Sequence, residues 1–406
     1  MTNTIRVAVI GAGMAGKAHA AGYKAAGSVY KTNLPKIELM AISDINEAVG
    51  RDAQVRYGYQ RYESDWRKIA EAGDIDAVSV VVANSLHREI VEALLAAGKH
   101  VLCEKPLSDT LENAQAIAVA AEAAEAKGIL ARIGFSFLRA PGIAFIRKLI
   151  DDGRLGKINH FSGRYWCDYG AHADAPFSWR YQGPMGSGAL GDVGSHLSYI
   201  AEYLCGETLE VSGGRFYTAI SHRPKPSGAV VGHTRGGGGE LTPVENDDYA
   251  AYSARFTNTV GTLQVSRVAS GHPNGLLIEV FGTKGAARWE QANPSQVEVL
   301  MMDDPDDISG YRTIPLSGAH PYYSGGWPVD APGVGIGQND LFLHQVRAFL
   351  EEVAGIPEAE SLPRCAKLTD GVHNMELLAA VAKSAAQNGA AVTVPTGKNT
   401  IAAPKR

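Results

Sequence analysis

Short apolar runs alternate with longer amphipathic stretches through the first third of the chain. The apolar runs cover residues 5–10, 37–43, 77–83, 100–103 and 129–135. Between them, apolar residues recur with helical spacing over 14–26, 66–72, 86–97 and 111–127. Runs of this length are typical of strands buried on both faces, and their alternation with helices predicts a parallel, doubly wound sheet.

The pattern changes beyond residue 135. After an expected helix at 141–152, apolar and polar residues alternate over 157–166, 249–256, 261–268 and 276–281. Such alternation is typical of an antiparallel or mixed sheet with one face solvated or paired. Helices at 341–353 and 371–386 close the chain, and 28–36 and 221–239 are expected to be insertions. We therefore expect an α/β protein with a doubly wound Rossmann domain at 1–135 and an α+β domain at 136–406. The second domain would be built on a large, mostly antiparallel, open-faced sheet.

Three glycines with G-x-G-x-x-G spacing follow the first apolar run. Gly11 would permit a tight turn, Gly13 would leave room for a pyrophosphate, and Gly16 would let the next helix pack closely on the strand. The helix opens at Met14 and Ala15, whose end of the helix offers free N–H groups to phosphates. We therefore assign these residues to dinucleotide binding; a purely structural glycine turn is the alternative.

An acidic residue ends the second predicted strand. Asp44 stands where a dinucleotide fold contacts the adenosine ribose, and its carboxylate would repel a 2′-phosphate. Ile45 follows, and the next basic residue is Arg51. The pattern therefore favours NAD over NADP, with Asp44 and Ile45 at the ribose. Asp44 could also cap a helix, since Glu47 lies three residues further on, and the two roles are compatible.

Two further strand ends carry polar residues. Asn84 and His87 follow the strand at 77–83, and ligands in open α/β sheets bind at the carboxyl ends of strands, so both are cofactor-site candidates. The alternative is that Ser85 only caps the following helix. The strand at 100–103 leads into Glu104-Lys105-Pro106, from which Lys105 can project into the cofactor crevice. Taken in isolation, this turn is explained more simply by a surface lysine paired with Glu104.

A glycine-rich segment at 186–191 leads into a predicted helix that carries Asp192 and His196. Their i, i+4 spacing places both side chains on one helix face. A carboxylate beside an imidazole orients the ring and favours its protonated form. Such a pair can accept the proton that an alcohol releases when it becomes a carbonyl. An acidic first turn and a hydrogen-bonded helix histidine explain the same spacing without catalysis.

Taken together, these motifs resemble the Gfo/Idh/MocA oxidoreductase family. The glycine turn, Glu104-Lys105-Pro106 and Gly191-Asp192-x-x-x-His196 occur in the family order over nearly the whole chain. The resemblance implies that Lys105 and His196 lie beside the nicotinamide and the substrate hydroxyl. It also implies that Asp192 holds the substrate or the histidine, and that Pro106 follows a cis peptide bond.

The resemblance extends to residues without a motif of their own. It implies cofactor contacts from Trp179 and Arg180 and from the Glu104 turn, and it suggests that Tyr322, in the aromatic segment 320–327, lines the substrate site. Aromatic rings suit pyranose faces, although a subunit contact explains this segment equally well. Two segments depart from the family pattern: Val82-Ala83-Asn84 replaces Thr-Pro-Asn, and Ser136-Phe137-Leu138-Arg139 replaces Asn-Tyr-Arg, which leaves the role of Arg139 open.

The activity implied by the resemblance is NAD-dependent oxidation of a pyranose, anhydrosugar or inositol. A secondary hydroxyl would become a ketone, with the hydride going to C4 of the nicotinamide and the proton to Lys105 or His196. An NAD-dependent glycosidase that works by transient oxidation and elimination would use the same residues. A non-catalytic NAD(H)-binding regulator is a more distant alternative, because it would not need these residues.

Composition and charge exclude other classes of function. The chain has 406 residues, of which 45% are hydrophobic and 20% charged, with a net charge of −5, so no basic face for nucleic acid is expected. No apolar run reaches the roughly 18 residues of a membrane span. The four scattered cysteines include no C-x-x-C pair, which predicts no metal site and suits a cytoplasmic protein. We expect a homodimer or homotetramer assembled through the open face of the second domain's sheet.

Overall fold

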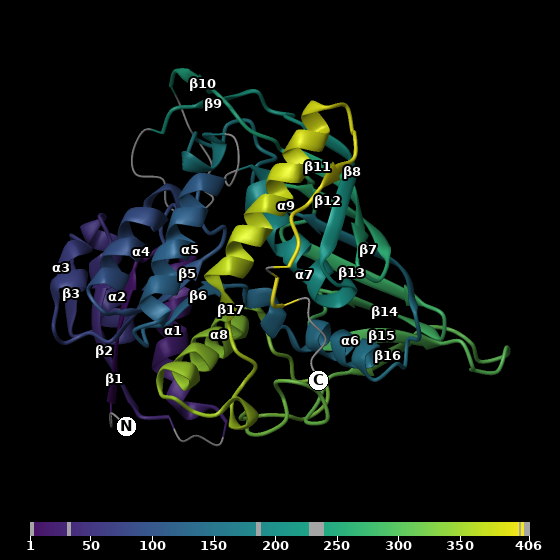
Figure 1. Cartoon of the computed structure of the whole chain (residues 1–406), viewed down its shortest axis with the longest axis horizontal. Coiled ribbons are helices and arrows are strands. Elements are labelled where there is room, and N and C mark those ends of the chain that lie inside the picture. Colours follow the sequence, from purple (N-terminus) through teal and green to yellow (C-terminus); the bar gives the residue numbers. More distant parts are fainter. Residues whose placement is uncertain (1–3, 31–33, 184–187, 227–238, 398, 402–406) are drawn as a thin grey trace. The chain divides into compact units, whose positions relative to one another are not determined.

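The computed structural model describes residues 4–30, 34–183, 188–226, 239–397 and 399–401 (Figure 1). Parts of the predicted insertions (31–33 and 227–238) and residues 184–187, which include the start of the glycine-rich lead-in, lie outside the described residues. The chain forms two compact units. The first unit comprises residues 1–139, 325–330 and 337–372, and the second unit comprises residues 140–324, 331–336 and 373–406.

The first unit contains a seven-stranded sheet with the order β17-β6-β5-β4-β1-β2-β3. Its strands are β1 (Thr4–Ile10), β2 (Lys36–Ser43), β3 (Arg61–Glu63), β4 (Ala77–Val80), β5 (His100–Glu104), β6 (Ala131–Gly134) and β17 (Ala366–Lys367). All neighbours are parallel except β17, which pairs antiparallel with β6. The doubly wound parallel sheet expected from the alternation of strands and helices is therefore confirmed.

Most helices of the first unit begin and end close to the predicted positions, but no helix was predicted over residues 47–57. They are α1 (Met14–Ala25), α2 (Glu47–Tyr57), α3 (Arg67–Glu71), α4 (His87–Ala96), α5 (Leu111–Glu125) and α8 (Gln338–Val353). Local chemistry sets several of these limits. The Thr110 side chain accepts a hydrogen bond from the Asn113 N–H at the start of α5, and Gly58 ends α2 in the left-handed conformation.

One helix of the first unit comes from late in the sequence. Helix α8 packs against α1, where a Cβ on Gly22 would lie 2.9 Å from Val346 Cγ2, so this close approach requires glycine. Phe349 of α8 belongs to the same buried core as Val7 of β1 and Leu102 of β5. The periodicity predicted this helix but gave no indication of its partner.

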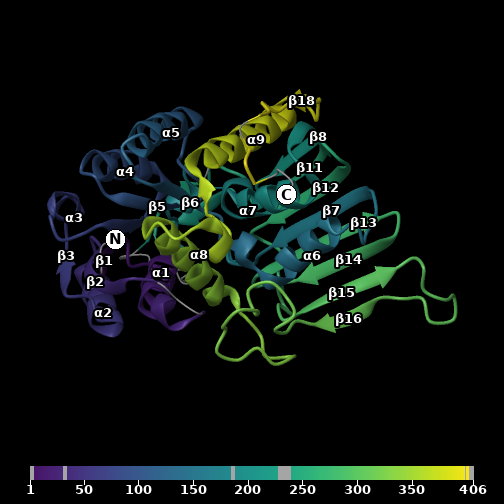
Figure 2. The ribbon, with the colours of Figure 1, turned by 60° about the horizontal axis from the view of Figure 1, so that its bottom comes forward.

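The second unit is built on a nine-stranded sheet with the order β16-β15-β14-β13-β7-β12-β11-β8-β18 (Figure 2). Its strands are β7 (Ile158–Trp166), β8 (Thr208–Tyr217), β11 (Tyr249–Phe256), β12 (Val260–Ser266), β13 (Gly275–Gly282), β14 (Gly285–Glu290), β15 (Gln296–Met301), β16 (Arg312–Pro315) and β18 (Val392–Thr393). A short hairpin pairs β9 (His222–Pro224) with β10 (Leu241–Pro243). Only β7 and β12 pair in parallel among the strand pairs of this sheet that are described. The large, mostly antiparallel sheet is as expected.

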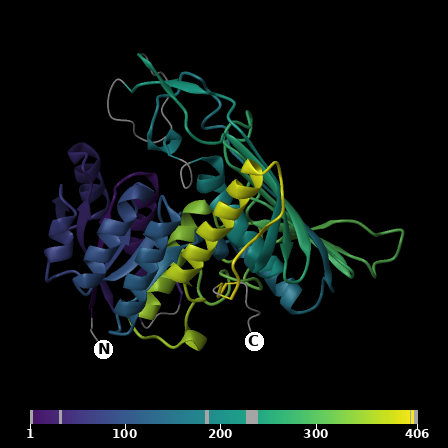
Figure 3. The ribbon, with the colours of Figure 1, turned by 45° about the horizontal axis from the view of Figure 1, so that its top comes forward.

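Helices cover one face of this sheet. They are α6 (Pro141–Asp151), α7 (Ser195–Cys205) and residues 373–386 of α9 (Leu368–Ala386), and Figure 3 shows α9 on one side of the strands. Alternation along β12 matches this layering, because Leu263 and Val265 are buried while Thr262 and Gln264 are exposed. A shallow hollow on the outer face is lined by residues of β7, β12 and β13, among them Arg164, Trp166, Gln264 and Glu279. None of the helices within the described ranges is long and apolar enough to cross a membrane.

Candidate active site

At two of the three glycines in the turn after β1, an added Cβ would collide with the backbone. Gly11 has a φ of +98°, and a Cβ at this position would lie 2.1 Å from the carbonyl oxygen of Val81. A Cβ on Gly16 would lie 1.8 Å from the Gly11 oxygen. Gly13 differs, because its Cβ would meet nothing within 4 Å. The turn is therefore closed against its own sheet and open at Gly13.

Open space at Gly13 adjoins the start of α1. Gly13 is the N-cap of this helix and has no side chain to accept from its first N–H groups, and the first turn carries no acidic residue. Met14, the first helical residue, is 70% exposed. An uncapped helix N-terminus beside an open glycine fits the pyrophosphate of a dinucleotide.

Asp44 ties the end of β2 to this turn. One carboxylate oxygen accepts from the Ala12 N–H at 2.8 Å, and the other accepts from the Asn46 N–H at 2.8 Å. Asn46, not Asp44, caps α2, since its side chain accepts from the Val49 N–H. The capping alternative for Asp44 was therefore wrong. Ile45 is 94% exposed beside it, which leaves this strand end accessible to a ribose.

Asn84 and His87 are both buried after β4. The His87 ring lies between two backbone carbonyls, with Nδ1 3.1 Å from Leu107 O and Nε2 3.2 Å from Val82 O. Burial lowers the pKa of His87, and a neutral ring can donate to only one of these two carbonyls. Leu86 is the N-cap of α4 and makes no side-chain hydrogen bond there, which contradicts the alternative that Ser85 caps this helix. Strand β4 itself ends at Val80, three residues earlier than expected.

The turn after β5 contains the expected cis peptide bond between Lys105 and Pro106. The Glu104 carboxylate is buried and accepts from His19 Nε2 at 2.9 Å, from Gln345 Nε2 at 3.2 Å and from the Lys105 N–H at 3.3 Å. Burial alone would raise the pKa of Glu104, but the His19 hydrogen bond and the nearby positive charge of Lys105 hold it below its ordinary value. The simpler explanation of this turn as a surface ion pair therefore does not describe Glu104.

Asp192 and His196 lie in the second unit on a helical segment that is not α-helical throughout. Residues Leu190–Gly194 form a π-helical turn, and α7 begins only at Ser195, so the expected single α-helix was wrong for Asp192. Such turns are frequently found at functional sites. The wider turn changes the angle between the two side chains that the i, i+4 rule gives.

Two tyrosines contact this pair. Tyr169 donates its hydroxyl to Asp192 Oδ2 at 2.8 Å, and the Tyr199 hydroxyl lies 2.7 Å from His196 Nδ1. Burial raises the pKa of Tyr169, and the charge of Asp192 raises it further, so the phenol remains a donor. Tyr169 was missed in the sequence, because it lies in an irregular segment 23 residues before its partner.

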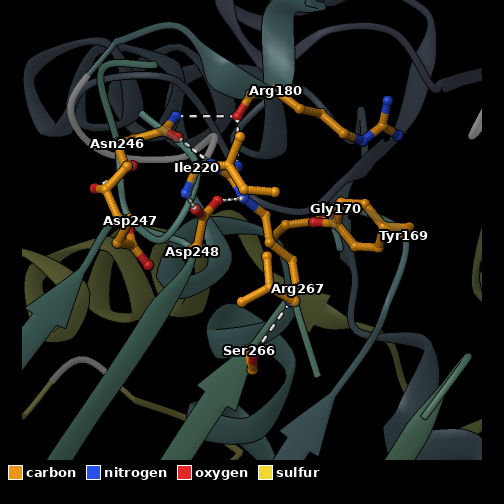
Figure 4. Close-up of polar contacts among 12 residues, drawn as sticks. Tyr169, Gly170, Arg180, Ile220, Asn246, Asp247, Asp248, Ser266 and Arg267 are labelled. Atoms are coloured by element: carbon orange, nitrogen blue, oxygen red, sulfur yellow. Dashed lines mark hydrogen bonds and ion pairs between the residues drawn. The ribbon is translucent and has the colours of Figure 1, made fainter. Parts of the chain in front are cut away.

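A buried polar network holds the segment with Trp179 and Arg180 (Figure 4). The carbonyl oxygen of Arg180 accepts from Asn246 Nδ2 at 3.0 Å and from Arg267 Nη1 at 2.9 Å. The Arg180 side chain points away from the network, and its guanidinium lies 4.5 Å from the centre of the Trp179 ring. The network thus fixes the backbone of this segment.

The same network reaches the π-helical turn. Arg267 and Asp248 form a fully buried ion pair at 2.7 Å. Next to it in the chain, Asp247 accepts from the Leu190 N–H at 2.8 Å. A Cβ on Gly188 would lie 2.1 Å from Asp247 Oδ1, so the turn closes directly on this carboxylate. Residues 246–248 therefore hold both the Arg180 segment and the turn that carries Asp192.

Tyr322 is 7% exposed and has a φ of +65°, an uncommon conformation for a residue with a side chain. The adjacent Tyr323 holds the loop that contains Tyr322. Its hydroxyl donates to Val334 O and accepts from the Ile336 N–H, both at 3.0 Å, and so closes the loop between them. Within the described ranges, no group of three or more His, Cys, Asp or Glu residues is arranged to hold a metal ion.

Comparisons with known proteins show the family of the chain. Residues 5–131 match the oxidoreductase family with an NAD-binding Rossmann fold, and residues 143–288 match the GFO/IDH/MocA C-terminal domain. The chain is 36% identical over 342 residues to levoglucosan dehydrogenase of Pseudarthrobacter phenanthrenivorans, covering 83% of this chain and 86% of that one. It is 28% identical to scyllo-inositol 2-dehydrogenase (NAD(+)) of Bacillus subtilis, over 70% of this chain and 74% of that one. Among solved structures, levoglucosan dehydrogenase in complex with NADH and levoglucosan superposes with a TM-score of 0.85 at 31% identity, covering 97% of this chain and 100% of that one.

Proposed function

This chain belongs to the Gfo/Idh/MocA oxidoreductase family and uses NAD, and from that premise we propose that it oxidises a secondary hydroxyl of a pyranose, anhydrosugar or inositol to a ketone. The observation that carries the proposal is the likeness to levoglucosan dehydrogenase over most of both chains. An anhydropyranose such as levoglucosan is therefore the first substrate to test. The inositol dehydrogenase likeness is weaker and supports a cyclitol as the second class.

The proposal assigns the cofactor contacts to several groups of residues. The open turn at Gly11 and Gly13, with the N–H groups at Met14 and Ala15, would hold the pyrophosphate. Asp44 and Ile45 would contact the adenosine ribose. The proposal gives the remaining contacts to a further set of residues: Asn84, His87, Glu104, Lys105, Trp179 and Arg180. When bound, NAD supplies the hydride acceptor.

The chain's own residues would supply the acid–base chemistry. Lys105 and His196 are the proposed acceptors of the hydroxyl proton. Asp192, held by Tyr169, would accept a hydrogen bond from a substrate hydroxyl, and Tyr322 would line the sugar. Positioned groups of this kind act only if they are held in place, which the buried contacts of Glu104 and Asp192 support.

A substrate screen tests the proposal. The purified protein is incubated with NAD⁺ and a panel of anhydrosugars, pyranoses and inositols, and NADH formation is followed with the sugar product. We expect stoichiometric NADH and ketone with at least one anhydrosugar or pyranose. Cleavage of a glycoside without net NADH would instead identify a glycosidase, and no turnover across the panel would contradict the proposal.

We also propose that two or four copies assemble through the outer face of the nine-stranded sheet, which exposes Thr262 and Gln264 and the shallow hollow beside them. A cytoplasmic location is proposed as well. Its support is that the four cysteines are buried thiols, which suits a reducing compartment.

A further inference from the structure

A chain of buried polar side chains lies behind the Lys105 turn in the first unit. From the Glu104 carboxylate it runs to His19 Nε2 at 2.9 Å, from His19 Nδ1 to Ser79 Oγ at 3.0 Å, and from Ser79 to the Tyr23 hydroxyl at 2.8 Å. His19, Ser79 and Tyr23 are at most 1% exposed. None of these three residues has a part in the proposed reaction, yet all are polar and completely buried.

The donors and acceptors of these hydrogen bonds follow from the chemistry of the side chains. A carboxylate can only accept, so His19 Nε2 donates to Glu104. In the neutral ring Nδ1 then accepts from the Ser79 hydroxyl, which in turn accepts from Tyr23. Burial raises the pKa of Tyr23, so its phenol keeps the proton that it donates. When the His19 ring is neutral, every member therefore donates towards Glu104.

Glu104 is confined on its other sides as well. A Cβ on Gly134 of β6 would lie 2.4 Å from Glu104 Oε1, and Gln345 of α8 donates to the same oxygen. Glu104 Oε2 accepts from the Lys105 N–H. The carboxylate thus has one position, and its second oxygen contacts the backbone of the residue proposed to be catalytic.

We propose that His19 is a positioning residue, which fixes the Glu104 carboxylate and through it the backbone of Lys105. The catalytic part of this inference rests on the proposed function. His19 lies on α1, the helix whose N-terminus adjoins the open glycine turn. One helix would therefore set the place of both the pyrophosphate and the Lys105 turn.

Two substitutions at one position separate this role from ordinary packing. In His19→Gln the side-chain amide nitrogen can take the place of Nε2 and keep the donor to Glu104. In His19→Asn the shorter side chain keeps a polar group near Ser79 but does not reach Glu104. Both variants replace the ring by an amide, so each is a matched control for the other in loss of packing.

Amide hydrogen exchange in the absence of NAD reads the effect directly. We expect the Lys105 amide, in a peptide spanning residues 103–110, to exchange about tenfold faster or more in His19→Asn and near the unmodified rate in His19→Gln. With an active substrate, kcat should fall about tenfold in His19→Asn, while NAD affinity changes less than about threefold. His19→Gln should keep most of its kcat.

Equal exchange rates in the two variants would overturn the inference, whatever the protein oxidises. Failure of the unmodified protein to oxidise any sugar would contradict only the proposed function, because the exchange measurement uses no substrate. If neither variant folds, Gly134→Ala provides a second test, since its methyl group must displace the Glu104 carboxylate. Unchanged exchange at Lys105 in that variant would contradict the inference as well.

Discussion

At the scale of single residues, the account depends on carboxylates whose partners lie far away in the sequence. Asp44 accepts from the glycine turn 32 residues before it, and Asp192 accepts from Tyr169. Each carboxylate has a fixed position before any ligand binds, which lowers the entropic cost of using it.

Asp44→Asn tests the origin of cofactor preference. The amide keeps an acceptor for the Ala12 N–H but removes the charge that repels a 2′-phosphate. We expect the ratio of kcat/KM for NAD to that for NADP to fall roughly tenfold or more. Steady-state kinetics with both cofactors measure it. Equal kcat/KM for the two cofactors in the unmodified protein would contradict the assignment.

Tyr169→Phe tests whether Asp192 needs its donor. The substitution keeps the ring and removes the hydroxyl that donates to Asp192 at 2.8 Å. Loss of a hydrogen bond to a charged group should lower kcat/KM for the sugar about tenfold, with NAD affinity unchanged. NAD titration and turnover on one preparation separate the two effects. Unchanged turnover would show that Asp192 keeps its place without Tyr169.

At the scale of elements, the π-helical turn Leu190–Gly194 is held by a hydrogen bond to a residue outside its own helix. Its N–H group at Leu190 is satisfied by Asp247, a buried carboxylate from another part of the second unit. The Asn246–Asp248 segment also holds the backbone of Arg180. Local stability and the position of two proposed site segments are therefore linked through one short stretch of chain.

Asp247→Ala tests whether stability and the position of the site segments are linked in this way. The Leu190 N–H loses its acceptor in a buried place, which should lower the free energy of unfolding by about 1–3 kcal/mol and reduce turnover. Asp247→Asn retains an amide oxygen in the same position and should keep both properties nearly intact. Denaturant unfolding gives the stability of both variants, and steady-state kinetics give their turnover. Identical behaviour of the two variants would argue against the hydrogen bond as the cause.

At the scale of the whole molecule, the outer face of the nine-stranded sheet is the surface proposed for assembly. Leu277→Glu places a charge beside the hollow on this face and should shift the oligomer towards monomer in light scattering. Val119→Glu on α5, where Val119 is 67% exposed, is the matched control and should leave the mass unchanged. A monomeric mass for the unmodified protein at working concentration would contradict the proposal.

Local patterns in the sequence were sufficient for most elements and for the glycine turn. Alternation predicted both sheets, because strand burial is visible in neighbouring residues. Contacts between residues far apart in the sequence could not be predicted in this way. His19 and Glu104 are 85 residues apart, and no residue near Gly22 indicates its close approach to α8. The π-helical turn was missed since its apolar pattern matches that of an α-helix, and the role of Asp247 follows only from where that turn begins.

The central claim is that Lys105 acts on the reacting hydroxyl, while the cofactor is held mainly by residues 11–16 and Asp44. Its most direct test is to titrate NAD binding and measure turnover on the same samples of Lys105→Met, with His196→Ala and the double variant alongside. The account predicts that kcat falls roughly a hundredfold or more in Lys105→Met while NAD affinity changes far less. The double variant should be less impaired than the product of the single effects, because both residues serve one proton transfer. Normal turnover in Lys105→Met, or a loss of NAD binding in proportion to the loss of rate, would contradict the claim.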